Sequence, residues 1–323
     1  MEVLPPDAPG NMPEPGTPQI VSVPPSRPSV LYGPNGLRAG WSIVIYVGVL
    51  ASLFILIGLE MRWLLHHVPA NLRGAHGGAF HPTMAILSEA SVLLAVLLAT
   101  AGMAQLEHRR TADYGLAGFD RVRQFFIGLV CGFAFLSLLI GILVATHRLT
   151  LTQSHMTLGW TLRYAVAWGL AFFLVGMTEE FMLRGYLLFT LARGIRFWPA
   201  ALVLAILFGA MHKGNPGESP FGLVAAAMIA LVFSLSLWRL GHLWWAIGFH
   251  ASWDWAESFF YGTADSGTVS VGRLMQAHPH GALLLSGGAT GPEGSVWIAL
   301  VILLAALLVW KTQPYRGIHL GQK

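Results

Sequence analysis

The stretch LRYAVAWGLAFFLVGMTEEFMLRGYLLFTL, residues 162–191, is an apolar segment of helical length that carries Glu179, Glu180 and Arg184 in its interior. About 20 such residues cross the hydrocarbon core of a bilayer, where each charge costs about 2.5 to 3.5 kcal/mol on insertion scales. On a helix, Glu180 and Arg184 share a face and can pair. A buried ion pair that fixes helix packing would explain these two charges. It would not explain Glu179, which is rotated by about 100° and has no local partner.

The composition around this stretch predicts a polytopic membrane protein. Of the 323 residues, 55% are hydrophobic and 11% are charged, whereas about a quarter are charged in soluble globular domains. The single cysteine, Cys131, lies in an apolar run, which excludes a disulfide framework and a thiolate zinc cluster. The net charge is +4, but the basic residues form no dense run, so we predict no nucleic-acid partner.

Apolar stretches of spanning or nearly spanning length predict an all-α fold, a polytopic membrane helix bundle of about eight spans. The fifth stretch is short, and the seventh is rich in Trp and polar residues. We place the spans near 41–62, 84–106, 125–146, 162–193, 198–213, 221–240, 242–262 and 295–311.

The spans divide the chain into five parts. Residues 1–37 hold 10 of the 18 prolines and predict a disordered, Pro-rich cytoplasmic tail. Residues 38–156 carry the first three spans, and residues 157–262 form a core of four spans. Residues 263–294 form an external loop, either a flexible connector or a cover over a cavity. Residues 295–323 hold the last span and a cytoplasmic C-terminus.

Charge distribution predicts the orientation. Twelve Lys and Arg residues fall on the side of the two termini and six on the other, and the loop 107–123 contains four arginines. Because cytoplasmic loops carry an excess of Lys and Arg, we expect both termini in the cytoplasm. The predicted location is integral membrane, in a bacterial inner (plasma) membrane.

Of the thirteen histidines, His242 opens the seventh predicted span, and only His212 and His250 lie inside predicted spans. Phe208 and His212 are four residues apart, as are His250 and Asp254, so each pair occupies one helix face. A carboxylate one turn from an imidazole can hold its tautomer and orientation. The two histidines are therefore candidates for chemistry as well as for packing.

Depth along the helices brings these groups together. The fourth and fifth spans form a hairpin around residues 193–197, and a rise of about 1.5 Å per residue puts Glu179 and His212 both roughly 24 Å from that turn. The same rise puts His250 and Asp254 at roughly 14 and 20 Å. Carboxylates and imidazoles around one cavity suit the activation of water for hydrolysis, with Glu179 as general base.

The motifs Glu179-Glu180-x-x-x-Arg184, Phe208-x-x-x-His212 and His250-x-x-x-Asp254, in this order and each in an apolar segment, resemble those of the CPBP family. This family (CAAX proteases and bacteriocin-processing enzymes, or Abi) includes the type II CAAX prenyl endopeptidases, and the resemblance covers about residues 160–262. It implies an intramembrane endopeptidase that acts on membrane-associated protein or peptide substrates, with membrane lipid as its other partner. Glu179 would activate water, His212, His250 and Asp254 would complete the site, and Glu180 and Arg184 would support it. Asp254 stands where the eukaryotic prenyl-protein enzymes carry Asn.

The sequence leaves two mechanisms open. His212, His250 and Glu179 provide the mixed nitrogen and oxygen set of a catalytic zinc site, which keeps one position for water. Without a metal, Glu179 deprotonates the water and His212 donates a hydrogen bond to the oxyanion, while His250 and Asp254 orient the substrate. Zinc is therefore a possible cofactor.

Two other functions use the same residues. In a proton- or ion-coupled transporter the buried Glu and His cluster would form a relay, but the sequence has no internal repeat and no matching pair of broken helices. A non-catalytic immunity or scaffold member of the family would be expected to lack a motif residue, and none is missing.

Overall fold

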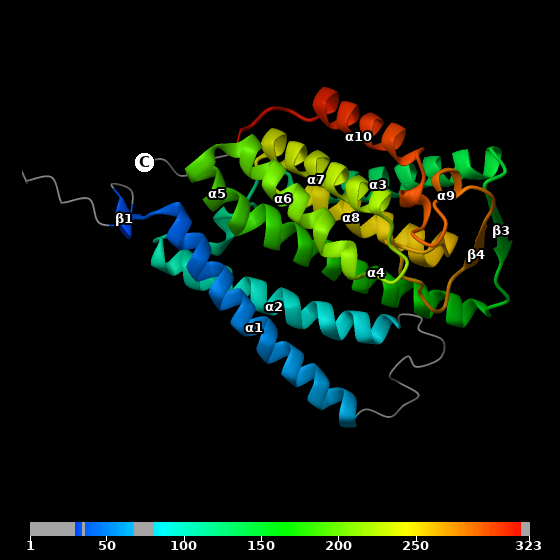
Figure 1. Cartoon of the computed structure of the whole chain (residues 1–323), viewed down its shortest axis with the longest axis horizontal. Coiled ribbons are helices and arrows are strands. Elements are labelled where there is room, and N and C mark those ends of the chain that lie inside the picture. The colour runs from blue at the N-terminus through cyan, green and yellow to red at the C-terminus, as the bar shows by residue number, and fades with distance from the viewer. Residues whose placement is uncertain (1–29, 34–35, 68–80, 318–323) are drawn as a thin grey trace, which may run out of the picture.

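Helices make up most of the computed structural model, which describes residues 30–33, 36–67 and 81–317 (Figure 1). Six helical runs are long and apolar enough to cross a membrane, and the chain is an integral membrane protein with a mostly helical bundle. The main helices are α1 (Ala39–His67), α2 (Pro82–Leu106), α3 (Arg121–Ala145), α4 (Leu158–Glu180), α5 (Leu188–Ile195), α6 (Phe197–Met211), α7 (Pro220–Leu240), α8 (Trp244–Trp255), α9 (Leu283–Ser286) and α10 (Ile298–Thr312).

Shorter helical segments join these elements. Two are π-helical turns that continue α4 and α8, namely η3 (Phe181–Leu187) and η5 (Ala256–Tyr261). The others are 3₁₀ turns, η2 (Thr111–Asp113), η4 (His212–Gly214) and η6 (Pro292–Gly294). The run from α4 through η3 to α5 is thus one long span, Leu158–Ile195, with a kink at Gly185, where ψ is −117°.

The two predicted spans with the weakest sequence signals, the fifth and the seventh, are both helical in the structure. The predicted fifth span, 198–213, is α6 and η4, and the predicted seventh, 242–262, is helical from Trp244 to Tyr261. The last span is a shorter apolar helix, Ile298–Thr312. Arg196 has a φ of 69° and separates α5 from α6, which confirms the tight turn expected around residues 193–197.

Helix α8 occupies the centre of the bundle. Its residues from Trp245 to Asp254 are buried, and it packs against α3, α4 and α7. Figure 1 shows α1 and α2 along one side of this core and α10 along the opposite side. A helix surrounded on all sides can be Trp-rich and polar in places because it faces protein rather than lipid.

Glycines let α3 approach α8 closely. A Cβ at Gly128 would lie 2.2 Å from the carbonyl oxygen of Trp245, and one at Gly132 would lie 2.1 Å from that of Phe249. A Cβ at Gly248 would meet the carbonyl oxygen of Phe125 at 2.2 Å. Small residues spaced four apart allow such close backbone contact between membrane helices, so this seam fixes the helix that carries His250.

Two short antiparallel sheets differ from the all-helical expectation. Strand β3 (Leu149–Gln153) pairs with β4 (Met275–Pro279), with Leu149 opposite Pro279 and Gln153 opposite Met275. Strand β1 (Tyr32–Gly33) pairs with β2 (Gly36–Leu37). These strands are too short to stand out in the sequence, and β-propensity depends strongly on context.

The two described ends of the chain lie at the same end of the bundle. The start of α1 contacts the end of α5, since a Cβ at Gly194 would lie 3.6 Å from the Ala39 Cβ. After α10, the backbone N–H of Arg316 donates to Arg239 at the end of α7, and Figure 1 shows both regions together. Most of the predicted disordered tail, and both termini, lie outside the described residues.

Candidate active site

Glu180 and Arg184 form the buried ion pair that their spacing predicts. Arg184 Nη1 donates to Glu180 Oε1 at 2.8 Å, and the Arg184 and Glu180 side chains are 1% and 0% exposed, respectively. The guanidinium carbon also lies 4.6 Å from the ring centre of Phe208 and 5.8 Å from that of Phe233. Arg184 is therefore neutralised on one side by a carboxylate and covered on the other by aromatic faces.

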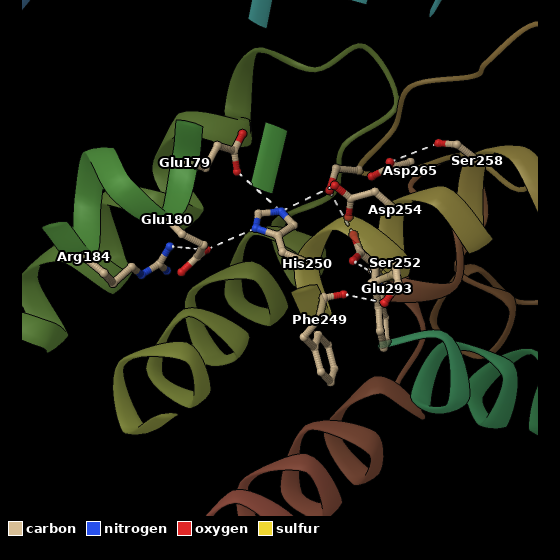
Figure 2. Close-up of polar contacts among 12 residues, drawn as sticks. Glu179, Glu180, Arg184, Phe249, His250, Ser252, Asp254, Ser258, Asp265 and Glu293 are labelled. Atoms are coloured by element: carbon tan, nitrogen blue, oxygen red, sulfur yellow. Dashed lines mark hydrogen bonds and ion pairs between the residues drawn. The ribbon is translucent and has the colours of Figure 1, made fainter. Parts of the chain in front are cut away.

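His250 lies between carboxylates from two helices (Figure 2). Its Nδ1 is 3.1 Å from Glu180 Oε1, and its Nε2 is 3.6 Å from Glu179 Oε2 and 3.5 Å from Asp254 Oδ2. A carboxylate oxygen accepts and does not donate when ionised, so the form that suits both ring nitrogens is the doubly protonated imidazolium. The expected contact between His250 and Asp254 is present.

Glu179 differs from Glu180 in its access to solvent. The Glu179 side chain is 25% exposed, whereas that of Glu180 is 0% exposed. Glu179 lines a cavity of about 200 Å³ that is also lined by His212, His250 and Asp254. The structure therefore brings to one cavity the four groups that the depth argument placed together.

His212 enters this cavity from the end of α6. Its Nδ1 lies 2.8 Å from the carbonyl oxygen of Phe208, so Nδ1 carries a proton and donates to that carbonyl. The Phe208 ring also contacts both histidines, at 4.8 Å from the His212 ring centre and 6.2 Å from that of His250. Nε2 of His212 remains as the nitrogen available for other chemistry.

Four acidic residues near this cavity were not among the predicted site residues. Glu89 on α2, Asp265 and Glu293 line the cavity, and Glu257 lies beside Asp265 and Glu293. Glu89 and Glu257 fall inside predicted spans, so their charge was a signal that could have identified them. Asp265 and Glu293 fall in the segment 263–294, where an acidic residue in a loop is unremarkable.

The segment 263–294 covers part of the cavity rather than only connecting two spans. Asp265, Ser266, Thr268, Ser270 and Glu293 are all among its lining residues. Burial, followed by the neighbouring carboxylate of Glu293, raises the pKa of Asp265 to about 7 against the opposing hydrogen bond from Ser258. A carboxyl of this kind lies close to its titration point at neutral pH.

The zinc set proposed from the sequence does not converge in this structure. Among the described residues, the group of His, Cys, Asp or Glu whose ligand atoms all lie within 4.8 Å of one another is Glu257, Asp265 and Glu293, and it does not include His212, His250 or Glu179. The donor geometry therefore does not fit a zinc ion held by these three residues.

Comparison with known proteins agrees with the motifs. Residues 160–256 match the family model described as type II CAAX prenyl endopeptidase Rce1-like, which is consistent with the CPBP family and supports a CAAX-protease-type intramembrane endopeptidase in general terms. The matched segment runs from α4 into the end of α8 and contains all six predicted site residues. No curated protein and no solved structure matches the chain.

Proposed function

We propose that this chain, whose residues 160–256 match the Rce1-like family model, is an intramembrane endopeptidase that hydrolyses peptide bonds of membrane-associated protein or peptide substrates. The observation that carries the proposal is the difference in surroundings between two adjacent carboxylates. Glu180 is fully buried and paired with Arg184, whereas Glu179 opens on the cavity beside His250. A general base must reach water, and Glu179 meets this requirement.

In the proposed reaction, Glu179 takes a proton from a water molecule as the water oxygen attacks the carbonyl carbon of the substrate. The resulting tetrahedral oxyanion needs a hydrogen-bond donor. His212 Nδ1 already donates to Phe208, so Nε2 donates only when the ring is an imidazolium, and the cationic ring then stabilises the oxyanion. As the C–N bond breaks, Glu179 returns its proton to the leaving nitrogen, which yields an amine and a carboxylic acid. The acid then ionises to the carboxylate, and its proton passes to the amine.

His250, Glu180 and Arg184 hold Glu179 in place in this scheme. The His250 ring lies between Glu179 and Asp254, so it limits the rotation of the proposed base. Glu180 fixes the other ring nitrogen, and Arg184 fixes Glu180. No step of this mechanism passes through a metal, because the histidines and Glu179 do not form a zinc-binding set here.

The direct test is peptide cleavage by purified protein in detergent, with a library of membrane-associated peptides and mass spectrometry of the products. We expect cleavage without any ion gradient. A transporter that used the same Glu and His cluster as a relay would require a gradient to act and would leave the peptides intact. A loss of activity on exhaustive chelation that zinc alone restores would replace the metal-free mechanism.

A further inference from the structure

Three carboxylates outside the proposed catalytic set lie close together beside the cavity. They come from separate parts of the chain: Glu257 from η5, Asp265 from the segment that follows η5, and Glu293 from η6. One oxygen of each lies within 4.8 Å of the others. Among the described residues, the ion pairs formed by Lys and Arg involve other acids, so no Lys or Arg in this part of the chain is paired with the cluster.

Glu257 is the member of this cluster that most needs a partner. Its side chain is 0% exposed, and neither of its carboxylate oxygens accepts a hydrogen bond in the described structure. The indole N–H of Trp253, which is close to this group, donates to Glu293 Oε1 at 2.8 Å instead. A buried carboxylate without a donor is costly unless a counter-charge is present.

The other two carboxylates are oriented by donors that leave acceptor capacity free. Glu293 accepts from Trp253 on Oε1 and from Ser266 on Oε2, at 2.8 and 2.9 Å. Asp265 Oδ2 accepts from Ser258 at 3.1 Å. Each carboxylate oxygen has two lone pairs, so these bonds hold the groups in position and leave lone pairs available, as the outer partners of metal ligands do.

We propose that Glu257, Asp265 and Glu293 bind a hard divalent cation, with Ca²⁺ the best fit. The ligand set is all oxygen, which suits Ca²⁺, Mg²⁺ and Mn²⁺ rather than softer metals. One oxygen of each of the three carboxylates lies within 4.8 Å of the others. Ca²⁺ accepts six to eight oxygen ligands in flexible geometry, whereas Mg²⁺ demands a near-ideal octahedron and usually binds through one or two carboxylates. Asp265 and Glu293 also line the cavity, so water can complete the coordination shell.

A glycine, Gly291, leaves space in the backbone beside the Glu257 carboxylate. Gly291 has a φ of +108°, and a Cβ there would lie 2.2 Å from the carbonyl oxygen of Ala264 and 3.1 Å from Glu257 Oε1. A side chain at position 291 would therefore fill the space beside the Glu257 carboxylate. The bound ion would tie η5, which directly follows the helix of His250 and Asp254, to the two loop segments that cover the cavity.

Terbium luminescence tests this site in the full-length, detergent-purified protein. Tb³⁺ replaces Ca²⁺, and the Trp253 indole, which contacts Glu293, can sensitise its emission on excitation of tryptophan. We expect saturable emission that Ca²⁺ displaces. Because loss of a single outer partner already weakens metal binding by about 10 to 100-fold, loss of a direct ligand in Glu257→Gln should weaken Tb³⁺ binding at least about tenfold.

Matched variants distinguish this site from the catalytic one. Glu60→Gln, the same change at an exposed position of α1, and Glu179→Gln, in the catalytic set, should both bind Tb³⁺ as the wild type does. Glu293→Gln serves as the second ligand variant if Glu257→Gln does not fold. The proposal is overturned if the wild type shows no saturable emission, if a folded ligand variant binds Tb³⁺ unchanged, or if binding is lost in Glu179→Gln. None of these outcomes depends on whether the protein cleaves peptides.

Discussion

Glu179 and Glu180 are neighbours in the chain, and their side chains have different surroundings. Glu180 is held by Arg184 and by His250, each through its Oε1. Glu179 faces the cavity, with its Oε2 towards His250. One step of about 100° around a helix separates the proposed general base from the residue proposed to support it.

Replacement of Glu179 tests the first of these roles. Glu179→Gln keeps the shape of the side chain and removes the base, so the rate of peptide hydrolysis should fall by about 10² to 10⁴. The melting temperature in detergent should stay close to that of the wild type because the side chain is partly exposed. Glu60→Gln, on the exposed surface of α1, is the control for the chemical change. Wild-type turnover in Glu179→Gln would show that another group is the base.

The second role, support by the Glu180–Arg184 pair, is tested by a double-mutant cycle. Loss of one partner of a buried pair costs about 3 to 5 kcal/mol, because the other charge remains without compensation. Arg184→Met should therefore lower the melting temperature strongly, and addition of Glu180→Gln should restore part of the loss. Simple addition of the two single losses in the double variant would mean that the residues are not coupled.

At the residue scale, the sequence identified the charges that break an apolar pattern in short motifs. Glu180 and Arg184 were predictable because their spacing of four on a helix determines their contact. Asp265 and Glu293 were not, because their contact with Glu257 depends on how a long loop folds back onto η5. No local periodicity encodes that contact.

At the scale of helices, the seam between α3 and α8 determines where His250 lies. Gly128 and Gly132 of α3 lie against backbone carbonyls of Trp245 and Phe249. Phe249 immediately precedes His250, so any separation of the two helices displaces the imidazole. Hydropathy predicted both helices, but it does not report which face of α3 meets α8.

Two alanine substitutions on α3 test this seam against an open surface. Gly132→Ala places a Cβ 2.1 Å from the Phe249 carbonyl oxygen, whereas a Cβ at Gly141 has nothing within 4 Å. Overpacking of this kind costs about 1 to 3 kcal/mol, so Gly132→Ala should lower both the melting temperature and the hydrolysis rate. Gly141→Ala should leave both unchanged or raise stability slightly, since Ala favours helix over Gly. Equal effects of the two substitutions would argue against a tight α3–α8 contact.

Among the elements with weak sequence signals, the helical spans were predictable from the sequence and the strand pairing was not. The spans 198–213 and 242–262 were predicted and are helical, because a run of apolar residues at spanning length has few alternatives in a membrane. The pairing of β3 with β4 was missed, because each strand has five residues and its partner is more than a hundred residues away.

Across the whole molecule, Glu107 joins the first helices to the segment that carries the site. Its carboxylate accepts hydrogen bonds from Ser42 of α1, Tyr114, Tyr186 of η3 and Arg193 of α5, at 2.8 to 2.9 Å. Burial alone would raise the pKa of Glu107, but the hydrogen bonds from Arg193 and then Tyr114 outweigh it and lower the pKa below its ordinary value. The ionised form is therefore the one that the fold stabilises.

This pKa shift predicts how the contribution of Glu107 varies with pH. A carboxyl whose pKa is lowered by folding stabilises the protein above its unfolded pKa, near 4.3, and the stabilisation is lost as the pH falls towards the folded pKa. Glu107→Gln should therefore be less stable than the wild type by about 1.5 to 3 kcal/mol at neutral pH, the range for a hydrogen bond to a charged group. The difference in melting temperature should shrink below about pH 4. A difference that stayed constant into acid would contradict this assignment.

The pairing of β3 with β4 also has a consequence for the order of events during synthesis. Strand β3 ends at Gln153 and its partner begins at Met275, so the ribosome must add the whole segment from α4 to η5 before the pair can close. At about 5 to 20 residues per second, this takes on the order of ten seconds. Glu179, Glu180 and Arg184 enter the growing chain early in that interval, whereas their partner His250 is added near its end. The nascent protein must therefore hold these charges without their final neighbours. We expect the cavity to assemble at about the time when the completed chain leaves the ribosome.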